Sequence, residues 1–231
     1  MSIAETPVAA EPSISTLAEL IFDLGDIPLN RVVARPAPGT ATEKDLLSYS
    51  DRTGLNCELI DGTLVIKSMG YTESVLAMIL GHWINSYLDK EPLGACAGGD
   101  GLCKLLPGLT RAPDVSFMIR ERLAQAEDLT FAPGAPDLCV EVLSKSNTRR
   151  EINRKIKEYF QHGARLVWVF DIRKKVAEIY LGSTDPILAQ PADSIEGRDV
   201  LPGFQFVLGD LFAAVEKRVT GVLPAGDQSE S

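Results

Sequence analysis

The chain has 231 residues, of which 45% are hydrophobic, 24% charged and 6% aromatic. This length fits one domain with appendages and is sufficient to bury a core without disulfide bonds. The chain contains 23 Lys and Arg against 32 Asp and Glu, for a formal net charge of −9. That balance excludes a protein that coats nucleic acid or an anionic membrane with its whole surface, although it is compatible with a local basic site.

The four cysteines form no C-x-x-C motif, and the chain has two histidines. We therefore expect reduced thiols rather than a disulfide framework, and no His-rich zinc site. The first residues lack the basic and apolar regions of a signal peptide, and no apolar run reaches the roughly 18 residues that a membrane helix needs. These features predict a soluble protein in the cytoplasm that does not bind membranes.

Three regions are expected along the chain. Residues 1–40 form a partly disordered N-terminal extension, residues 41–217 the folded domain, and residues 218–231 a flexible tail, because both ends are small and polar. Between the ends there is no internal repeat and no low-complexity linker, which favours one domain over two.

The predicted elements alternate in type along the domain. Helices are predicted at 14–22, after a cap at Thr40 or Thr42, at 73–88, 147–161 and 211–216. A hairpin is predicted at 57–67 around Asp61-Gly62, with further strands at 102–106, 113–119, 137–143, 166–171, 176–180 and 204–207. Strands interleaved with helices predict an α/β or α+β fold with a central mixed sheet flanked by helices.

Two carboxylates lie inside otherwise apolar strands. Alternation places Asp114 on one face of its strand with Ser116, and Glu141 on one face of the next with Cys139 and Leu143. A buried carboxylate is costly unless it is paired or coordinated. If the two acids converge at the ends of neighbouring strands, they form a hard-oxygen site suited to Mg²⁺ or Mn²⁺. The alternative is two edge carboxylates, each paired with a nearby arginine.

The helix at 147–161 adds a lysine to this picture. Its apolar stripe consists of Ile152, Ile156, Tyr159 and Phe160, and Lys155 borders that stripe. The Lys155 stem can therefore run over apolar side chains while its ammonium reaches the strand ends. An ammonium beside two metal-binding carboxylates can orient a water nucleophile or stabilise a pentavalent phosphate.

Charge is unevenly distributed along the chain. Residues 145–175 contain ten Lys or Arg and three acids, a balance of +7, so the other 200 residues carry −16. Such a segment predicts a localised phosphate-binding face. The alternative is a solvated helix and hairpin whose basic side chains pair with acids.

Four motifs follow one another along the chain, beginning at Cys57 (CELIDGTLV), Arg111 (RAPDVSF), Pro136 (PDLCVEVLS) and Lys155 (KIKEYFQHGARLVWVFD). In this order and spacing they resemble the Uma-two family of putative restriction endonucleases, and the resemblance runs from about 40 to 212. It implies membership of the PD-(D/E)XK nuclease superfamily and a restriction-endonuclease-like core, a mixed sheet flanked by helices.

The resemblance also implies site residues. The family's first acid falls on Asp114 and its second on Glu141, and the superfamily's usual lysine position is occupied by Leu143. The catalytic lysine would then come from the following helix as Lys155, with Lys145 in the preceding turn as its rival. Glu58 is a further candidate acid, although a purely local role in the hairpin fits its position equally well.

The function implied is a Mg²⁺- or Mn²⁺-dependent endonuclease that hydrolyses DNA. Asp114, Glu141 and the Val142 carbonyl would hold the metal, while Lys155 would position the attacking water. A homodimer is expected, because cutting both strands of a duplex requires two active sites. The alternative is a catalytically silent nuclease fold that serves as a binding or regulatory module.

Overall fold

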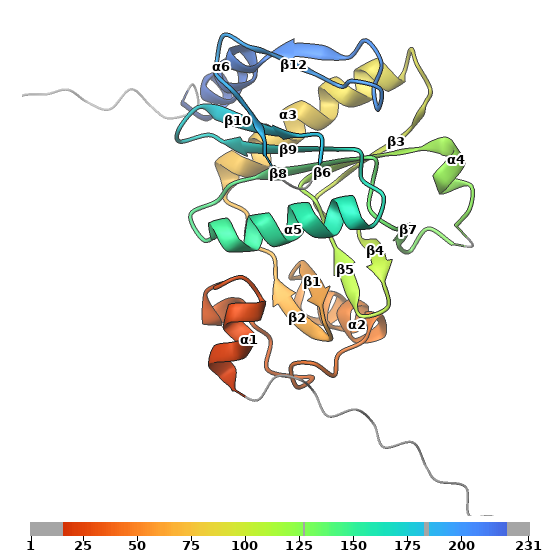
Figure 1. Cartoon of the computed structure of the whole chain (residues 1–231), viewed down its shortest axis with the longest axis vertical. Coiled ribbons are helices and arrows are strands. Elements are labelled where there is room, and N and C mark those ends of the chain that lie inside the picture. Colours follow the sequence, from red (N-terminus) through yellow and green to blue (C-terminus); the bar gives the residue numbers. More distant parts are fainter. Residues whose placement is uncertain (1–15, 127, 183–184, 221–231) are drawn as a thin grey trace, which may run out of the picture.

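The computed structural model describes residues 16–126, 128–182 and 185–220, and its elements are labelled in Figure 1. The helices are α1 (Leu17–Asp23), the 3₁₀ helix η1 (Leu29–Arg31), α2 (Glu43–Thr53), α3 (Tyr71–Leu88), α4 (Arg120–Leu123), α5 (Arg149–Gln161) and α6 (Leu208–Val219). The strands are β1 (Cys57–Ile60), β2 (Thr63–Ile66), β3 (Gly94–Gly98), β4 (Cys103–Leu106), β5 (Leu109–Arg111), β6 (Val115–Ile119), β7 (Ala132–Pro133), β8 (Leu138–Val142), β9 (Leu166–Asp171), β10 (Val176–Tyr180), β11 (Ile187–Ala189), β12 (Ser194–Glu196) and β13 (Gln205–Val207).

A six-stranded mixed sheet forms the centre of the fold, in the order β11-β10-β9-β8-β6-β3. Strands β8 and β9 are parallel and the other neighbours are antiparallel. Helix α5 lies on one face of this sheet, and α3 and α6 lie on the other (Figure 1). The alternation of β9 accounts for this layering, because Trp168 and Phe170 join the core under α3 and α6 while Val167 and Val169 join the core under α5.

A second, five-stranded sheet in the order β2-β1-β5-β4-β7 lies on the far side of α5 (Figure 1). Its β1–β2 hairpin turns at Asp61 and Gly62, whose φ angles of 48° and 70° match the positive values that a two-residue hairpin turn requires. Helix α2 packs on this hairpin and buries Leu46, Leu59 and Leu64. Helix α5 is therefore enclosed between two sheets, and a polar side chain on it can be buried.

The segment before α2 packs on α5, although the sequence places it in an extension. Leu20, Leu24 and Ile27 share the hydrophobic core of α5. The side chain of Arg31 donates to both carboxylate oxygens of Glu151 on α5, at 3.1 and 2.7 Å. Residues 1–15 and 221–231 lie outside the described residues, as does the start of the helix predicted at 14–22.

The predicted elements are present with shifted ends. The predicted fold, a central mixed sheet flanked by helices, is confirmed. Thr42 rather than Thr40 caps α2, accepting a hydrogen bond from the Asp45 amide. The helix predicted at 211–216 is longer, because it extends over the whole of α6. The predictions missed β3, an edge strand of the central sheet, because Gly-Ala-Cys-Ala-Gly lacks the branched apolar residues that mark strands.

All four cysteines are free thiols. Within the described ranges, no helix is both long enough and apolar enough to cross a bilayer.

Candidate active site

Asp114 lies beside the end of β8 that carries Glu141. Strands β6 and β8 pair antiparallel as far as Val115 opposite Val140, and Asp114 directly precedes β6. The Asp114 amide donates to the Val140 carbonyl at 2.8 Å, and its carboxylate accepts from the Val142 amide, so Asp114 contacts both neighbours of Glu141. The strands therefore bring the two predicted acids close together.

Asp114 is 4% exposed, and each of its carboxylate oxygens has a partner. Oδ2 accepts a hydrogen bond of 2.7 Å from the Val142 amide, which ties the acid to the end of β8. Oδ1 lies 2.8 Å from the ammonium of Lys67, the residue that follows β2. The chain therefore holds this carboxylate in place from two elements, one in each sheet.

Glu141 is 3% exposed and points from β8 toward α5. Lys155 donates to its two oxygens at 3.2 and 3.0 Å, and the Tyr159 hydroxyl donates to Oε1 at 2.5 Å. Lys155 and Tyr159 are four residues apart on α5, so both side chains reach the same acid from one helix face. The prediction that Lys155 approaches the strand ends is confirmed, and its burial is more complete than the sequence implied, at 2% exposed.

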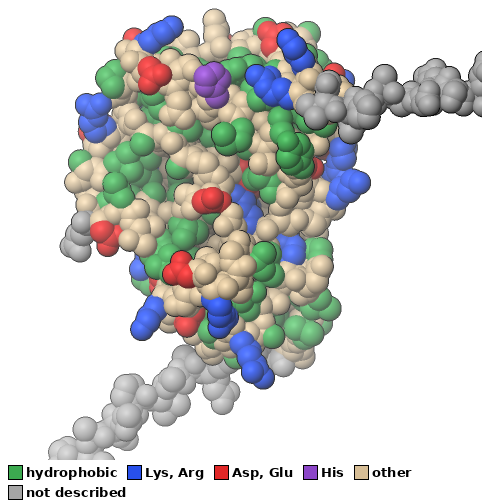
Figure 2. Space-filling model, turned by 180° about the vertical axis from the view of Figure 1, so that it is seen from behind, with side chains coloured by type: hydrophobic (Ala, Val, Ile, Leu, Met, Phe, Trp, Pro, Cys, Tyr) green, Lys and Arg blue, Asp and Glu red, His purple; other side chains and the backbone are tan. Residues whose placement is uncertain are grey.

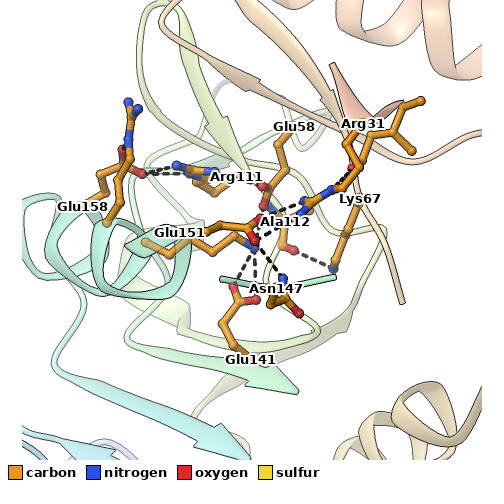
Figure 3. Close-up of polar contacts among 12 residues, drawn as sticks. Arg31, Glu58, Lys67, Arg111, Ala112, Glu141, Asn147, Glu151 and Glu158 are labelled. Carbon is orange, nitrogen blue, oxygen red and sulfur yellow. Dashed lines mark hydrogen bonds and ion pairs between the residues drawn. The ribbon is translucent and has the colours of Figure 1, made fainter. Parts of the chain in front are cut away.

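Glu58 joins the same buried cluster from β1. Lys155 lies 3.1 Å from its Oε1, the Ala112 amide donates to that oxygen at 3.1 Å, and Arg111 donates to Oε2 at 2.9 Å. Arg111 also binds Glu158 of α5 at 2.7 Å. Figure 3 shows these side chains converging from both sheets and from α5. Glu58 therefore does more than satisfy its own hairpin.

The charges in this cluster shift one another's pKa values. Burial disfavours the ionised form of Glu58, but Lys155 and Arg111 outweigh it and hold the pKa of that carboxyl below its usual range. Burial raises the pKa of Glu141, and the neighbouring Asp114 and Glu58 carboxylates raise it further, against the attraction of Lys155. Burial opposes the charge on Lys155, yet Glu141 and Glu58 raise its pKa above the usual value.

The buried carboxylates and the cations that contact them balance. The carboxylates are Glu58, Asp114, Glu141 and Glu158, and the cations are Lys67, Arg111, Arg154 and Lys155. In the described ranges, no group of three or more His, Cys, Asp or Glu side chains is close enough to form a complete protein cage for a metal. Two carboxylates still fit Mg²⁺, which commonly keeps several waters and uses one or two carboxylates with substrate phosphates.

A cavity of about 820 Å³ opens beside Asp114. It lies between α3 and β3, and the turn after β3 and the loop before β1 complete its wall. Lys67 and Asp114 both line it, together with Asn56 and Asp100, which hydrogen-bond to each other. Figure 2, seen from the side opposite α5, shows a hollow near the middle of this face, with acidic and basic side chains at it. A ligand in the cavity would therefore have Asp114 and Lys67 at its wall.

The basic segment at 145–175 is largely neutralised by acids from elsewhere in the chain. Six of its ten Lys and Arg lie within 4.0 Å of a carboxylate outside the segment, among them Arg149 with Glu178 and Lys175 with Glu216. Two more, Arg173 and Lys174, pair with Asp171 inside it. Lys145 and Lys157 are exposed and have no such partner among the described residues. The face in Figure 2 likewise carries scattered charges of both signs rather than one basic field.

Sequence reasoning missed three members of the cluster, namely Lys67, Arg111 and the Glu158 that Arg111 binds. Arg111 directly precedes the Ala-Pro-Asp114 motif, but nothing in its spacing shows that it bridges Glu58 and Glu158. Lys67 follows an apolar strand, and its sequence position is typical of a solvent-exposed lysine at a strand end. Its contact with Asp114 depends on how the two sheets meet, which no local pattern encodes.

Comparison with known proteins identifies the family and supports the fold. A protein-family model, Uma2, described as "Putative restriction endonuclease", matches residues 43–214. No curated protein matches the chain. Among solved structures, a crystal structure titled as a "putative nuclease belonging to DUF820 from Anabaena variabilis" is similar at a TM-score of 0.63 and 20% identity, covering 71% of this chain and 93% of that one. That likeness shows a shared fold, and the family match over most of the domain carries the assignment: the chain belongs to the Uma2 family of restriction-endonuclease-like proteins.

Proposed function

We propose that the protein is a divalent-metal-dependent endonuclease that hydrolyses phosphodiester bonds in DNA. The observation that carries the proposal is the position of Asp114, which hydrogen-bonds to both backbone neighbours of Glu141 at the end of β8, in a buried cluster of charges. The nuclease family supports a nucleic acid as the substrate. The choice of DNA, and of Mg²⁺ or Mn²⁺ as the metal, belongs to this proposal.

Asp114 and Glu141 would hold the metal, with the backbone carbonyl of Val142 beside them. The Val142 amide already binds the Asp114 carboxylate, so this stretch of backbone borders the acid. When bound, the metal would polarise the scissile phosphate and lower the pKa of an attacking water. The raised pKa of Glu141 supports the assignment, because a nearby cation would relieve the repulsion among the three acids.

The remaining residues orient these ligands. Tyr159 and Lys155 fix the rotamer of Glu141, and Arg111 fixes Glu58, which in turn holds the Lys155 ammonium. Lys155 would position the attacking water and stabilise negative charge on the phosphorane, as the family resemblance implies. A fully buried ammonium between two carboxylates is held within the narrow tolerance that a catalytic group requires.

Plasmid nicking tests the proposal. Wild type should convert supercoiled plasmid to open-circular or linear DNA in the presence of Mg²⁺ or Mn²⁺, and not in EDTA. The variants Asp114→Asn and Glu141→Gln should lose this activity. Both substitutions keep side-chain size, and melting curves verify folding. Equal activity in the three proteins would point to a contaminating nuclease and reject the assignment.

A silent binding module is the alternative outcome of the same experiments. One feature favours it, since Lys67 and Lys155 already neutralise Asp114 and Glu141. Calorimetry with Mn²⁺ separates the two functions. Binding that is lost in Asp114→Asn supports the enzyme, whereas no saturable binding at millimolar metal supports the module.

We also propose a two-fold homodimer, which would present one site to each DNA strand. Light scattering at micromolar concentration tests this, and a 25.0 kDa species alone would contradict it.

A further inference from the structure

Lys67 is a fixed cation at the wall of the cavity. Its ammonium lies 2.8 Å from Asp114 Oδ1 and donates to the carbonyls of Ala112 and Gly99, at 2.6 and 3.1 Å. The Lys67 side chain is 6% exposed. Three acceptors match the three ammonium protons, so this side chain is held in one place.

The two lysines of the cluster differ in what they face. Among the described residues, the partners of the Lys155 ammonium are the carboxylates of Glu58 and Glu141. Lys155 is not one of the described residues that line the cavity. Lys67 does line the cavity, and two of its three partners are neutral carbonyls. Those two carbonyls would still hold the Lys67 ammonium at the cavity wall if its third acceptor, Asp114, were exchanged for a phosphate oxygen.

Lys67 would also repel a metal at Asp114. Its ammonium contacts Oδ1 at 2.8 Å, while Oδ2 accepts the Val142 amide at 2.7 Å. A cation ligated by this small carboxylate would lie close to the ammonium, so the two positive charges compete for Asp114.

We propose that Lys67 is a catalytic residue that competes with the divalent metal for Asp114 and, once displaced, contacts the scissile phosphate from the cavity side. This inference rests on the proposed function. A phosphate oxygen would supply the acceptor that Lys67 loses to the metal, so metal and DNA bind cooperatively. Free protein then binds metal weakly, and the complete site assembles on the substrate.

The test measures Mn²⁺ affinity by calorimetry without DNA, and affinity for a short DNA duplex in Ca²⁺ by fluorescence anisotropy. The variants are Lys67→Met and Lys67→Gln, the second of which keeps a donor for the two carbonyls. Lys104→Met is the matched control, because Lys104 pairs with Glu43 at 3.1 Å away from the site. Melting curves establish whether each variant is folded.

Both Lys67 variants should bind Mn²⁺ about tenfold more tightly than wild type, since they lack the competing charge, and the duplex about tenfold more weakly. The control should change neither affinity. If Lys67 had only a structural role, its loss would loosen the site and the variants would bind Mn²⁺ more weakly than wild type. Unchanged or weaker Mn²⁺ binding in the folded variants would overturn the proposal, as would loss of the fold in both.

Asp114→Asn separates the two hypotheses. If it abolishes Mn²⁺ binding while the Lys67 variants match wild type, the metal site stands and the role of Lys67 is wrong. If it binds Mn²⁺ as well as wild type does, or if no form of the protein binds, the proposed function fails and the inference fails with it.

Discussion

Replacing Arg111 by methionine should destabilise the protein through the acids that it leaves behind. Arg111 is 1% exposed and binds Glu158 at 2.7 Å and Glu58 at 2.9 Å. Methionine retains most of the apolar stem but removes the charge. Removing one partner of a buried ion pair costs about 3–5 kcal/mol, because the other charge stays buried and uncompensated. With an m-value of about 3 kcal/mol per M, the urea midpoint should fall by roughly 1 to 2 M.

The deficit should depend on pH. Arg111 helps to hold the folded-state pKa of Glu58 below its usual 4.5, so this interaction stabilises the protein above pH 4.5. Its contribution is lost as the pH falls through the lowered folded-state pKa. The difference in the free energy of unfolding between wild type and Arg111→Met should therefore be largest near pH 7 and should shrink below pH 4.5.

Urea titrations at pH 7 and at pH 4 measure both effects. Arg149→Met is the control, because Arg149 makes an equally short pair with Glu178 at 2.6 Å but its side chain is 50% exposed. That variant should lose less than about 1 kcal/mol. Adding Glu58→Gln to Arg111→Met should recover part of the loss. A loss below about 1 kcal/mol for Arg111→Met, or a larger loss at acid pH, would refute the reasoning.

Three further predictions concern the site and its support. Tyr159→Phe should cost about 1.5–3 kcal/mol in urea unfolding, because it removes a hydrogen bond to the ionised Glu141; a neutral result would mean that this contact is not made. Gly25→Ala should lower the melting temperature more than Gly54→Ala: both glycines have positive φ, but the added methyl meets the Glu151 backbone at 2.7 Å only at Gly25. Lys155→Ala should abolish cleavage with Mn²⁺ binding nearly intact, whereas Lys145→Ala should mainly weaken DNA binding and flatten its salt dependence; the reverse pattern would assign catalysis to the loop lysine.

The parts of the site that could be predicted from sequence are those with a local period. Alternation within two apolar strands predicts the faces on which Asp114 and Glu141 lie, and the pairing of β6 with β8 puts them at the same end of the sheet. Helical periodicity likewise placed Lys155 beside the sheet, four residues before Tyr159. Both predictions needed only the side-chain periodicity of the strand or helix that carries the residue.

The unpredicted contacts join elements that are distant in sequence. Lys67 meets Asp114 because the end of the β1–β2 hairpin lies beside the segment that joins β5 to β6, and Arg111 bridges β1 to α5. The charge of residues 145–175 suggested a phosphate-binding face because its partners lie elsewhere in the sequence. Acids such as Glu178 and Glu216, outside the segment, pair with its basic side chains. Counts of charge within a window carry no information about such partners.

The position of a bound metal tests the central claim most directly. A crystal of the protein with Mn²⁺ and a short DNA duplex, measured at the manganese absorption edge, would locate the ion by anomalous scattering. We predict one peak in contact with both Asp114 and Glu141, with the Lys67 ammonium moved from Asp114 Oδ1 to a phosphate oxygen. Manganese bound elsewhere, with the Lys67–Asp114 and Lys155–Glu141 pairs both intact, would contradict the account.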